Sequence, residues 1–333
     1  MTIKIAINGF GRIGRMTLRS IIENKRKDIE IVAINNRSNA EISSFLLAHD
    51  TIHGSLKNKI SYSHQSISID GKKISMIQEK EISNIDWKKY KIDVVLECTG
   101  KFNSKEKSAQ HIKSGAKKVL VSAPCKGATN IVFGVNHKNI NSNDKIISAA
   151  SCTTNCLAPV AKVLNDSFKI ERGFMTTIHS YTTDQRLLDN SHKDLRRARA
   201  ATNSMIPTTT GATKSLGDII PELKGKVEGI SIRVPTPNVS LVEFVFNSNQ
   251  KLTVEKINNS FIKASKSNLK NILNVNTKPF VSSDFNHNPH SAIADLSLTK
   301  VVENKMGKVS AWYDNEWGFA SRMCDLASYF AKI

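Results

Sequence analysis

The sequence has no apolar run long enough to span a membrane and no paired set of cysteines. Cys152 and Cys156 are four residues apart, which is not the spacing of a zinc site, and no Cys/His pair follows them. We therefore expect no metal and no disulfide framework from the five scattered cysteines among the 333 residues: Cys98, Cys125, Cys152, Cys156 and Cys324.

The N-terminal residues do not have the basic, apolar and small-residue order of a signal peptide, because a strand-like Ile3–Ile7 begins almost at once. We therefore expect a cytoplasmic protein with no membrane partner. The composition, 40% hydrophobic and 23% charged, is typical of a globular protein, and the length allows two domains.

Acidic residues are also few, with 29 Asp and Glu against 48 Lys and Arg, which gives a formal charge of +19. Such a charge fits phosphorylated substrates, a nucleic acid or an acidic partner. The lysines are spread along the whole chain, and no zinc finger, RNA-binding aromatic signature or basic helix is present. We therefore expect that a nucleic acid is not the main partner.

Buried strands alternate with helices in the first half of the chain, which predicts an α/β fold with a doubly wound parallel sheet of the Rossmann type. The turn-rich stretch Lys59–Ile82 predicts a hairpin inserted into that sheet. The strands are predicted at Ile3–Asn8, Ile29–Asn35, Asp93–Cys98 and Lys118–Ser122, and the helices at Arg15–Asn24 and Lys105–Ser114.

The second half alternates apolar with polar residues, which predicts an α+β catalytic domain with a mostly antiparallel sheet. We expect a dinucleotide-binding domain over residues 1–150 and a catalytic domain over 151–315, with a C-terminal helix at about 316–333 packing back on the first. A long polar segment between Tyr181 and Pro207 has no clear period, which is typical of a functional or intersubunit loop. Strands are predicted at Gly173–His179, Gly229–Val234, Val239–Phe246 and Val309–Tyr313, and helices at Val254–Ser265 and Arg322–Ala331.

Gly9-Phe-Gly-Arg-Ile-Gly14 has the form G-x-G-x-x-G between a predicted strand and a predicted helix. Its glycines permit a tight turn and let a pyrophosphate approach the helix N-terminus. A tight turn with no ligand is the alternative. At the end of the second strand stands Asn36, followed by Arg37, where an NAD-preferring fold normally has an acidic residue. This favours acceptance of NADP as well as NAD.

Cys152 lies within Ser151-Cys-Thr-Thr-Asn-Cys156, before an apolar segment that predicts a buried helix. Ser and Thr are helix-capping residues, so the positive end of the helix would face the sulfur. A thiol in such a place loses its proton more easily and is a nucleophile near neutral pH. The alternative for a lone cysteine is a core residue.

Seven segments, in order and with the expected spacing from Ile3 to the last helix, resemble the phosphorylating glyceraldehyde-3-phosphate dehydrogenase family. They are Asn8-Gly-Phe-Gly-Arg-Ile-Gly-Arg15, Ala150-Ser-Cys-Thr-Thr-Asn-Cys-Leu-Ala-Pro159, His179-Ser-Tyr-Thr182, Asp194-Leu-Arg-Arg-Ala-Arg199, Pro207-Thr-Thr-Thr-Gly-Ala212, Arg233-Val-Pro-Thr-Pro-Asn238 and Trp312-Tyr-Asp-Asn-Glu-Trp-Gly318.

The resemblance implies that Cys152 attacks the aldehyde of D-glyceraldehyde 3-phosphate and that His179 is the general base. A hemithioacetal and then a thioester would form on Cys152, and inorganic phosphate would release 1,3-bisphosphoglycerate in a reversible reaction. It also implies two anion sites and a homotetramer. Thr182 and Arg233, with Arg197 nearby, would bind the substrate phosphate, and inorganic phosphate would be bound by Ser151, Thr153, Thr210 and Gly211.

For NAD and/or NADP, the resemblance implies a second set of residues. Lys80 would lie near the adenine, and Asn315 would hold the nicotinamide carboxamide. Ser191 stands where NAD-specific members often have proline, and together with Asn36 it favours use of both cofactors. The full set is Gly9, Gly11, Arg12, Ile13, Gly14, Asn36, Arg37, Lys80, Ser122, Ser191 and Asn315.

Two alternatives remain at this point. Erythrose-4-phosphate dehydrogenase shares the Cys and His but usually lacks the Thr-Gly and Tyr-Thr that are present here as Thr210-Gly211 and Tyr181-Thr182. A nucleic-acid-binding protein that uses this fold is suggested only by the charge of +19.

Overall fold

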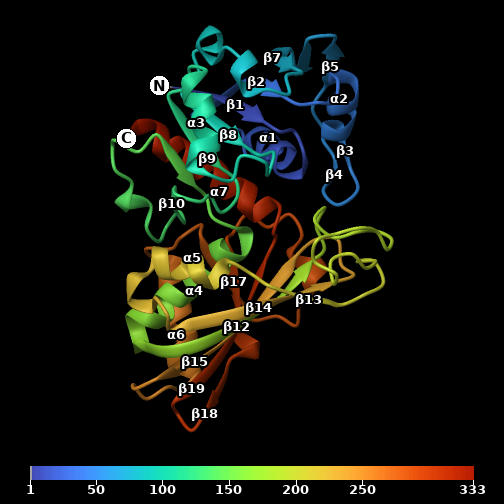
Figure 1. Cartoon of the computed structure of the whole chain (residues 1–333). Coiled ribbons are helices and arrows are strands. Elements are labelled where there is room, and N and C mark those ends of the chain that lie inside the picture. Colours follow the sequence, from blue (N-terminus) through green and yellow to red (C-terminus); the bar gives the residue numbers. More distant parts are fainter. Residues whose placement is uncertain (1) are drawn as a thin grey trace. The chain divides into compact units, whose positions relative to one another are not determined.

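The computed structural model describes residues 2–333, which form two compact units (Figure 1). The first unit comprises the residues up to Ile131 together with His137–Ala150 and Ala320–Ile333, and the second comprises Val132–Asn136 and Ser151–Phe319. None of the helices formed by residues 2–333 combines the length and apolarity needed to cross a membrane.

The first unit contains a nine-stranded sheet in the order β10-β11-β9-β8-β1-β2-β7-β6-β5. Neighbours from β10 to β7 are parallel, which confirms the predicted doubly wound α/β fold. The strands are β1 (Ile3–Asn8), β2 (Ile29–Asn35), β5 (Ile60–Ser63), β6 (Ser66–Ile69), β7 (Lys72–Ile77), β8 (Val94–Glu97), β9 (Lys118–Val121), β10 (Thr129–Asn130) and β11 (Ile146–Ser148).

The predicted inserted hairpin is present as the antiparallel strands β5, β6 and β7, which extend the edge of the parallel sheet. Asp70 and Gly71 connect β6 to β7 with φ of 49° and 82°. Both residues thus have the left-handed conformation that a tight hairpin turn requires and that Asp-Gly favours. A separate pair, β3 (His49–Asp50) and β4 (Gly54–Ser55), follows helix α2 (Ala40–Ala48).

Helices cover the sheet of the first unit, so that β1 is buried along nearly its whole length. The C-terminal helix packs on α1, where the Sγ of Cys324 donates to the carbonyl of Thr17 at 3.7 Å and the hydroxyls of Ser20 and Ser321 are 3.4 Å apart. These helices are α1 (Arg12–Glu23), α2 (Ala40–Ala48), α3 (Lys105–Lys113) and α7 (Trp317–Lys332), of which α7 belongs to the first unit from Ala320 on.

The second unit is built on a sheet in the order β13-β14-β12-β15-β19-β17-β16, with β18 paired to β19. Its pairs are antiparallel except β12 with β14 and β16 with β17. The strands are β12 (Ile170–Ser180), β13 (Ile206–Thr208), β14 (Val227–Val234), β15 (Ser240–Ser248), β16 (Leu273–Asn276), β17 (Ala292–Asp295), β18 (Lys300–Val302) and β19 (Met306–Tyr313).

Three helices lie together against this second sheet: α4 (Cys152–Phe168), α5 (Ala212–Ile219) and α6 (Val254–Lys266) (Figure 1). Residues of β15 are alternately buried and half-buried, as the predicted alternation requires. Between Tyr181 and Met205, all of which the structure describes, the chain forms a loop whose only regular pairing is an isolated bridge between Arg186 and Ala200. This confirms the predicted long irregular segment.

Candidate active site

Cys152 is the first residue of α4, immediately after the N-cap residue Ser151. The extended backbone of Ser151 lets its hydroxyl accept the N–H of Thr154 at 3.0 Å, so that the helix begins at the cysteine. Ala150 has a φ of 56°, a left-handed conformation that costs a non-glycine residue about 1 kcal/mol or more. The chain thus uses a strained turn and a cap to present the thiol at the helix N-terminus.

His179 faces that thiol from β12, next to the last residue of the strand. The Sγ of Cys152 and the Nε2 of His179 are 3.4 Å apart, within hydrogen-bonding distance for sulfur. The imidazole is only 2% exposed, while Cys152 keeps partial exposure. The structure therefore brings together the two residues that the sequence predicted to act as a pair.

Two groups contact the other ring nitrogen of His179. Its Nδ1 is 2.7 Å from the carbonyl oxygen of Ser180, and Nη1 of Arg233 is 2.7 Å from Nδ1 and 3.1 Å from the same oxygen. Since a carbonyl oxygen can only accept, we place the ring hydrogen on Nδ1, where it donates to Ser180, and let Arg233 donate to the same carbonyl rather than to the ring. Nε2 is then free to accept the thiol proton. His179 and Arg233 face each other across the β12–β14 pair, so the sheet register sets this contact.

Burial, followed by the charge of Arg233, lowers the pKa of His179 from 6.5 to about 3. Burial also raises the pKa of the Cys152 thiol, although Arg233 and donors of Thr153 act in the opposite direction. The helix N-terminus was expected to make this thiol more acidic, and in the structure the loss of solvation is the larger effect. The pair is therefore a neutral thiol beside a neutral imidazole.

Tyr313 was not predicted as a site residue, yet it lies directly behind the pair. Its buried hydroxyl is 3.0 Å from the Oγ1 of Thr153 and 2.9 Å from that of Thr177, and its ring meets His179 edge to face with centroids 5.9 Å apart. The hydroxyl of Thr153 is thus directed toward Tyr313. The sequence placed Tyr313 in a predicted strand, but nothing in the sequence indicated that its hydroxyl would contact Thr153.

Arg197 and Arg233 are close enough that the charge of Arg197 lowers the pKa of Arg233, after burial as the main cause. The Nε of Arg233 is buried and has no hydrogen-bond partner among the described residues. Arg197 donates to the Oγ1 of Thr208 at 2.8 Å and forms an ion pair with Asp184. A site with two repelling guanidinium groups and a free buried donor is suited to an oxyanion.

The remaining predicted anion ligands lie on this unit as well. Gly211 is the N-cap of α5 and has no side-chain cap, while the Oγ1 of Thr210 accepts the N–H of Ala212 at 3.2 Å. Open N–H groups at a helix N-terminus attract anions. Thr182 is instead engaged locally, because its N–H donates to the Oε1 of Gln185 at 2.9 Å.

The first unit has a separate groove of about 200 Å³ at the carboxyl edge of its sheet. The N-cap of α1, Gly11, carries no capping side chain, and the first turn of α1 has no acidic residue, so its N–H groups suit a pyrophosphate. These residues fit a dinucleotide. The groove is lined by Asn8, Gly9, Phe10, Gly11, Asn35, Asn36, Arg37, Glu79, Lys80, Ile82, Cys98, Thr99, Lys101 and Phe102.

Other predicted cofactor residues lie around the groove without lining it. Gly14 must be glycine, since a Cβ there would lie 2.2 Å from the carbonyl oxygen of Gly9. Arg12 forms an ion pair with Asp50, the carbonyl of Ile13 accepts the hydroxyl of Thr17 at 2.8 Å, and the N–H of Ser122 donates to the carbonyl of Glu97.

Two predicted cofactor residues belong to the second unit. The Oδ1 of Asn315 accepts the hydroxyls of Ser180 at 2.8 Å and Ser240 at 3.0 Å, which leaves its amide hydrogens free to donate. The carbonyl of Ser191 accepts two donors of Arg186 within the long loop.

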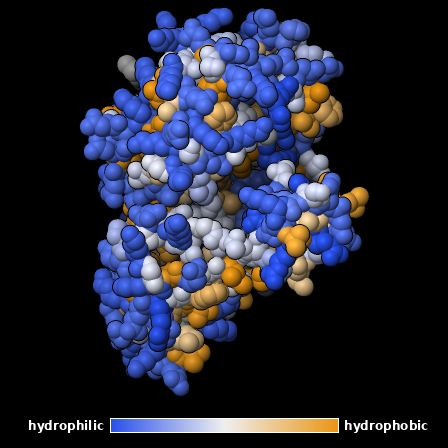
Figure 2. All heavy atoms as spheres, in the orientation of Figure 1, coloured by the Kyte–Doolittle hydropathy of each residue, from blue (hydrophilic) through white to orange (hydrophobic). Residues whose placement is uncertain are grey.

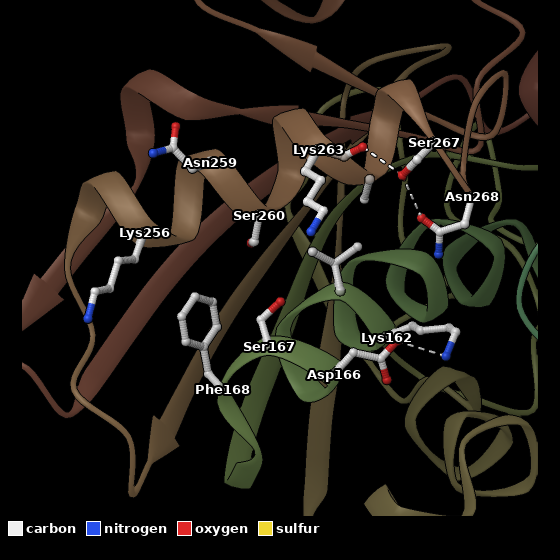
Figure 3. A pocket seen from close by; sticks show the side chains of 12 residues that line it. Lys162, Asp166, Ser167, Phe168, Lys256, Asn259, Ser260, Lys263, Ser267 and Asn268 are labelled. Atoms are coloured by element: carbon white, nitrogen blue, oxygen red, sulfur yellow. Dashed lines mark hydrogen bonds and ion pairs between the residues drawn. The ribbon is translucent and has the colours of Figure 1, made fainter.

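A second hollow of about 490 Å³ lies between α4 and α6 (Figure 3). Lys263 reaches into it, the ring of Phe168 lines it, and Lys162 is paired with Asp166 at 2.9 Å. None of the predicted site residues lines this hollow, and it contains no nucleophile paired with a base. Among residues 2–333 no cluster of His, Cys, Asp and Glu could hold a metal ion.

Comparison with known proteins gives matches over the whole chain. The model of the glyceraldehyde 3-phosphate dehydrogenase NAD binding domain matches residues 3–105, and that of the C-terminal domain of the same enzyme matches residues 151–315. A glyceraldehyde-3-phosphate dehydrogenase of Cereibacter sphaeroides is 52% identical over 334 residues, and one of Xanthobacter flavus is 50% identical over 334 residues, each covering 100% of both chains. Glyceraldehyde-3-phosphate dehydrogenase 2 of Bacillus subtilis (strain 168) is 48% identical over 333 residues, covering 99% of this chain and 97% of the relative.

Proposed function

The chain belongs to the glyceraldehyde-3-phosphate dehydrogenase family, and from this we propose that Cys152 and His179 are its nucleophile and general base. The protein is an NAD-dependent oxidoreductase that converts D-glyceraldehyde 3-phosphate and inorganic phosphate to 1,3-bisphosphoglycerate. The distance of 3.4 Å between Sγ and Nε2, at a helix N-terminus beside Arg233, carries the assignment of roles. The relatives bear the name of this enzyme, so neither erythrose 4-phosphate nor a nucleic acid gains support as the alternative.

The first step forms a bond between the Sγ of Cys152 and the aldehyde carbon. The Nε2 of His179 takes the thiol proton during the attack and returns it to the oxygen, which gives a hemithioacetal. Because both groups are neutral beforehand, the proton moves only when the sulfur has an electrophile to attack. A neutral thiol–imidazole pair thus protects the free thiol from unwanted reactions.

In the second step His179 removes the hydroxyl proton of the hemithioacetal as a hydride leaves the same carbon, and a thioester remains. When bound, NAD supplies the acceptor for this hydride. Inorganic phosphate then attacks the thioester carbon, the C–S bond breaks, and the thiolate takes back the proton held by His179. The protons of the thiol and of the hemithioacetal hydroxyl pass through Nε2. The proton of the attacking hydrogen phosphate stays on the acyl phosphate and is lost from there to water, which balances the overall reaction.

We propose separate binding sites for the substrate phosphate and for inorganic phosphate. Arg233, whose Nε is free and buried, binds the phosphate of the aldehyde substrate with Arg197 and Thr182. The open N-terminus of α5 at Thr210 and Gly211 binds inorganic phosphate with Ser151 and Thr153. Since the hydroxyl of Thr153 bonds to Tyr313, we propose that its backbone N–H, which also lowers the pKa of Cys152, contacts the anion.

We further propose that the enzyme accepts NADP as well as NAD. Asn36 and Arg37 line the groove where an acidic residue would repel a 2′-phosphate, and Lys80 adds a second cation. Ser191, from the long loop, is proposed to contact that phosphate from a neighbouring subunit, and Asn315 to bind the nicotinamide carboxamide through its free amide hydrogens.

A homotetramer in the cytoplasm is the proposed working state. Large apolar side chains are exposed on α2 and on the long loop, and Figure 2 shows orange, hydrophobic surface on both segments. Exposed apolar clusters of this kind are typical of subunit interfaces. They are Ile42, Phe45 and Leu46 on α2, and Leu187, Leu188, Leu195 and Met205 on the loop.

Steady-state kinetics with D-glyceraldehyde 3-phosphate tests the whole proposal. We expect reduction of NAD that depends on inorganic phosphate, measurable reduction of NADP, and no turnover by Cys152→Ser. Turnover that is independent of phosphate would contradict the acyl-phosphate product, and turnover by the Ser variant would contradict the nucleophile.

A further inference from the structure

A buried carboxylate lies beneath the nucleotide groove. Glu97, the last residue of β8, is 1% exposed. Its Oε1 accepts the N–H of Thr99 at 2.7 Å and also the hydroxyl of Thr99, while its Oε2 accepts the Nδ2 of Asn8 at 2.6 Å and lies 3.0 Å from the Nε2 of His111. Each oxygen therefore meets two donors, and the carboxylate links the ends of β1 and β8 to α3.

The orientation of the Asn8 amide is fixed by the backbone of Glu79, to which it is linked through the amide of Asn35. The Oδ1 of Asn8 accepts the Nδ2 of Asn35 at 2.7 Å. The same Nδ2 donates to the carbonyl of Glu79 at 3.0 Å, and the Oδ1 of Asn35 accepts the N–H of Glu79 at 2.9 Å. A peptide group cannot exchange its donor for its acceptor, so neither amide can flip without losing bonds. Asn8 must therefore present its NH₂ to residue 97.

The tautomer of His111 is fixed in the same way from the other side. The indole Nε1 of Trp87, which can only donate, lies 3.2 Å from the Nδ1 of His111. Nδ1 must accept, so the hydrogen is on Nε2 and points at Glu97. Trp87 and His111 are both 0% exposed, which leaves no room for water to replace either bond. Residue 97 thus faces fixed donors on both sides.

The two turns that Glu97 connects both line the nucleotide groove. A Cβ at Gly9 would lie 2.7 Å from the backbone nitrogen of Thr99, so the turn after β1 and the turn after β8 are in direct contact. The Oγ1 of Thr99, which donates to Glu97, also accepts the N–H of Lys101 at 3.1 Å. The position of the carboxylate therefore sets the position of both walls of the groove.

We propose that Glu97 is a positioning residue for the dinucleotide, and that only a carboxylate can fill this role because three fixed donors and the hydroxyl of Thr99 converge on it. The inference rests on the proposed function, since it concerns the cofactor groove of that enzyme. An amide of the same shape would place its NH₂ group either against the NH₂ of Asn8 and the Nε2–H of His111 or, turned around, against the N–H of Thr99. One of the walls must then move.

Glu97→Gln tests the requirement for a carboxylate at residue 97, because it replaces one carboxylate oxygen by an NH₂ group and keeps the shape of the side chain. Calorimetric titration of the whole protein with NAD, and separately with ADP-ribose, measures the groove without any catalytic step. We expect the Kd for both ligands to rise by about tenfold or more, because at least one buried donor loses its acceptor in either orientation of the new amide. At saturating NAD the kcat should stay within about twofold of the wild type, since the variant alters binding rather than the reacting groups.

Val119→Ala is the matched control, because Val119 is a buried residue of the same sheet that does not line the groove. It should lower the melting temperature and leave the Kd unchanged. Asn8→Asp added to Glu97→Gln restores an acceptor for the new NH₂ and keeps one for Asn35, so it should recover part of the affinity. Should Glu97→Gln not fold, His111→Leu removes one donor from the carboxylate and should raise the Kd as well.

An unchanged Kd in Glu97→Gln, or an equal rise in Val119→Ala, would overturn the inference. No recovery in the double variant would contradict the fixed polarity of Asn8. If the wild type bound no NAD, the proposed function itself would fail, so the two failures can be told apart.

Discussion

Replacing His179 by Asn should remove the general base while keeping a polar side chain in its place. In the structure the Nε2 of His179 lies 3.4 Å from the Sγ of Cys152, and the imidazole is 2% exposed. No other base contacts the sulfur among the described residues, and burial limits access of water to the pair. General acid–base catalysis contributes about 10²–10⁴-fold, so we expect kcat to fall by about 100-fold or more, which corresponds to about 2.7 kcal/mol.

The assay is single-turnover reduction of NAD with D-glyceraldehyde 3-phosphate, which isolates the hydride step, combined with alkylation of Cys152 by iodoacetamide. The Kd for NAD should not change, because His179 does not line the nucleotide groove. Cys156→Ala is the control: Cys156 is 0% exposed, and its Sγ donates to the carbonyl of Ala311 at 3.8 Å, away from His179. A His179→Asn variant that keeps a tenth or more of the wild-type rate would refute the assignment of the base.

Three further changes test other parts of the site. Asn36→Asp should raise the KM for NADP by about tenfold and leave that for NAD nearly unchanged, because a carboxylate repels the 2′-phosphate; equal KM ratios in both proteins would contradict this. Tyr313→Phe leaves two buried threonine hydroxyls without their partner, so the free energy of unfolding should fall by about 1–3 kcal/mol in urea titrations, and an unchanged midpoint would exclude the network. The pKa of His179 is lowered from 6.5 to about 3, so below pH 6.5 the unfolded chain binds a proton that the folded protein does not. Stability should therefore fall by about 2 kcal/mol between pH 8 and pH 5, and this part of the slope should be absent in His179→Asn.

The sequence predicted those features that depend on local order along the chain. The placement of Cys152 at a helix N-terminus beside capping residues and the glycine turn at Gly9 follow from residue type and neighbouring pattern, and both are found. The sequence missed α2, because its apolar Ile42 and Phe45 are exposed and so give no period that points to a buried face.

Contacts between distant segments could not be predicted in this way. Glu97 meets His111 only because α3 packs against β9, the strand next to β8, and Tyr313 meets Thr153 across 160 residues of sequence. The acidity expected for the Cys152 thiol was wrong for the same reason. A helix N-terminus can be recognised in a sequence, whereas the burial that raises the pKa of the thiol depends on the packing of the whole unit around it.

Arg233 connects the chemistry of the pair to recognition of the substrate. Its Nη1 lies 2.7 Å from the Nδ1 of His179 and opposes protonation of the imidazole, while its Nε is buried with no partner. A phosphate bound at that Nε would offset the guanidinium charge and so raise the pKa of His179, which makes it a stronger base. Since the same charge lowers the pKa of Cys152, the thiol would become a weaker acid at the same time. The two shifts oppose each other for the transfer of the thiol proton to Nε2, so the stronger base acts mainly in the hydride step, where His179 removes the hydroxyl proton of the hemithioacetal and no thiol proton is involved.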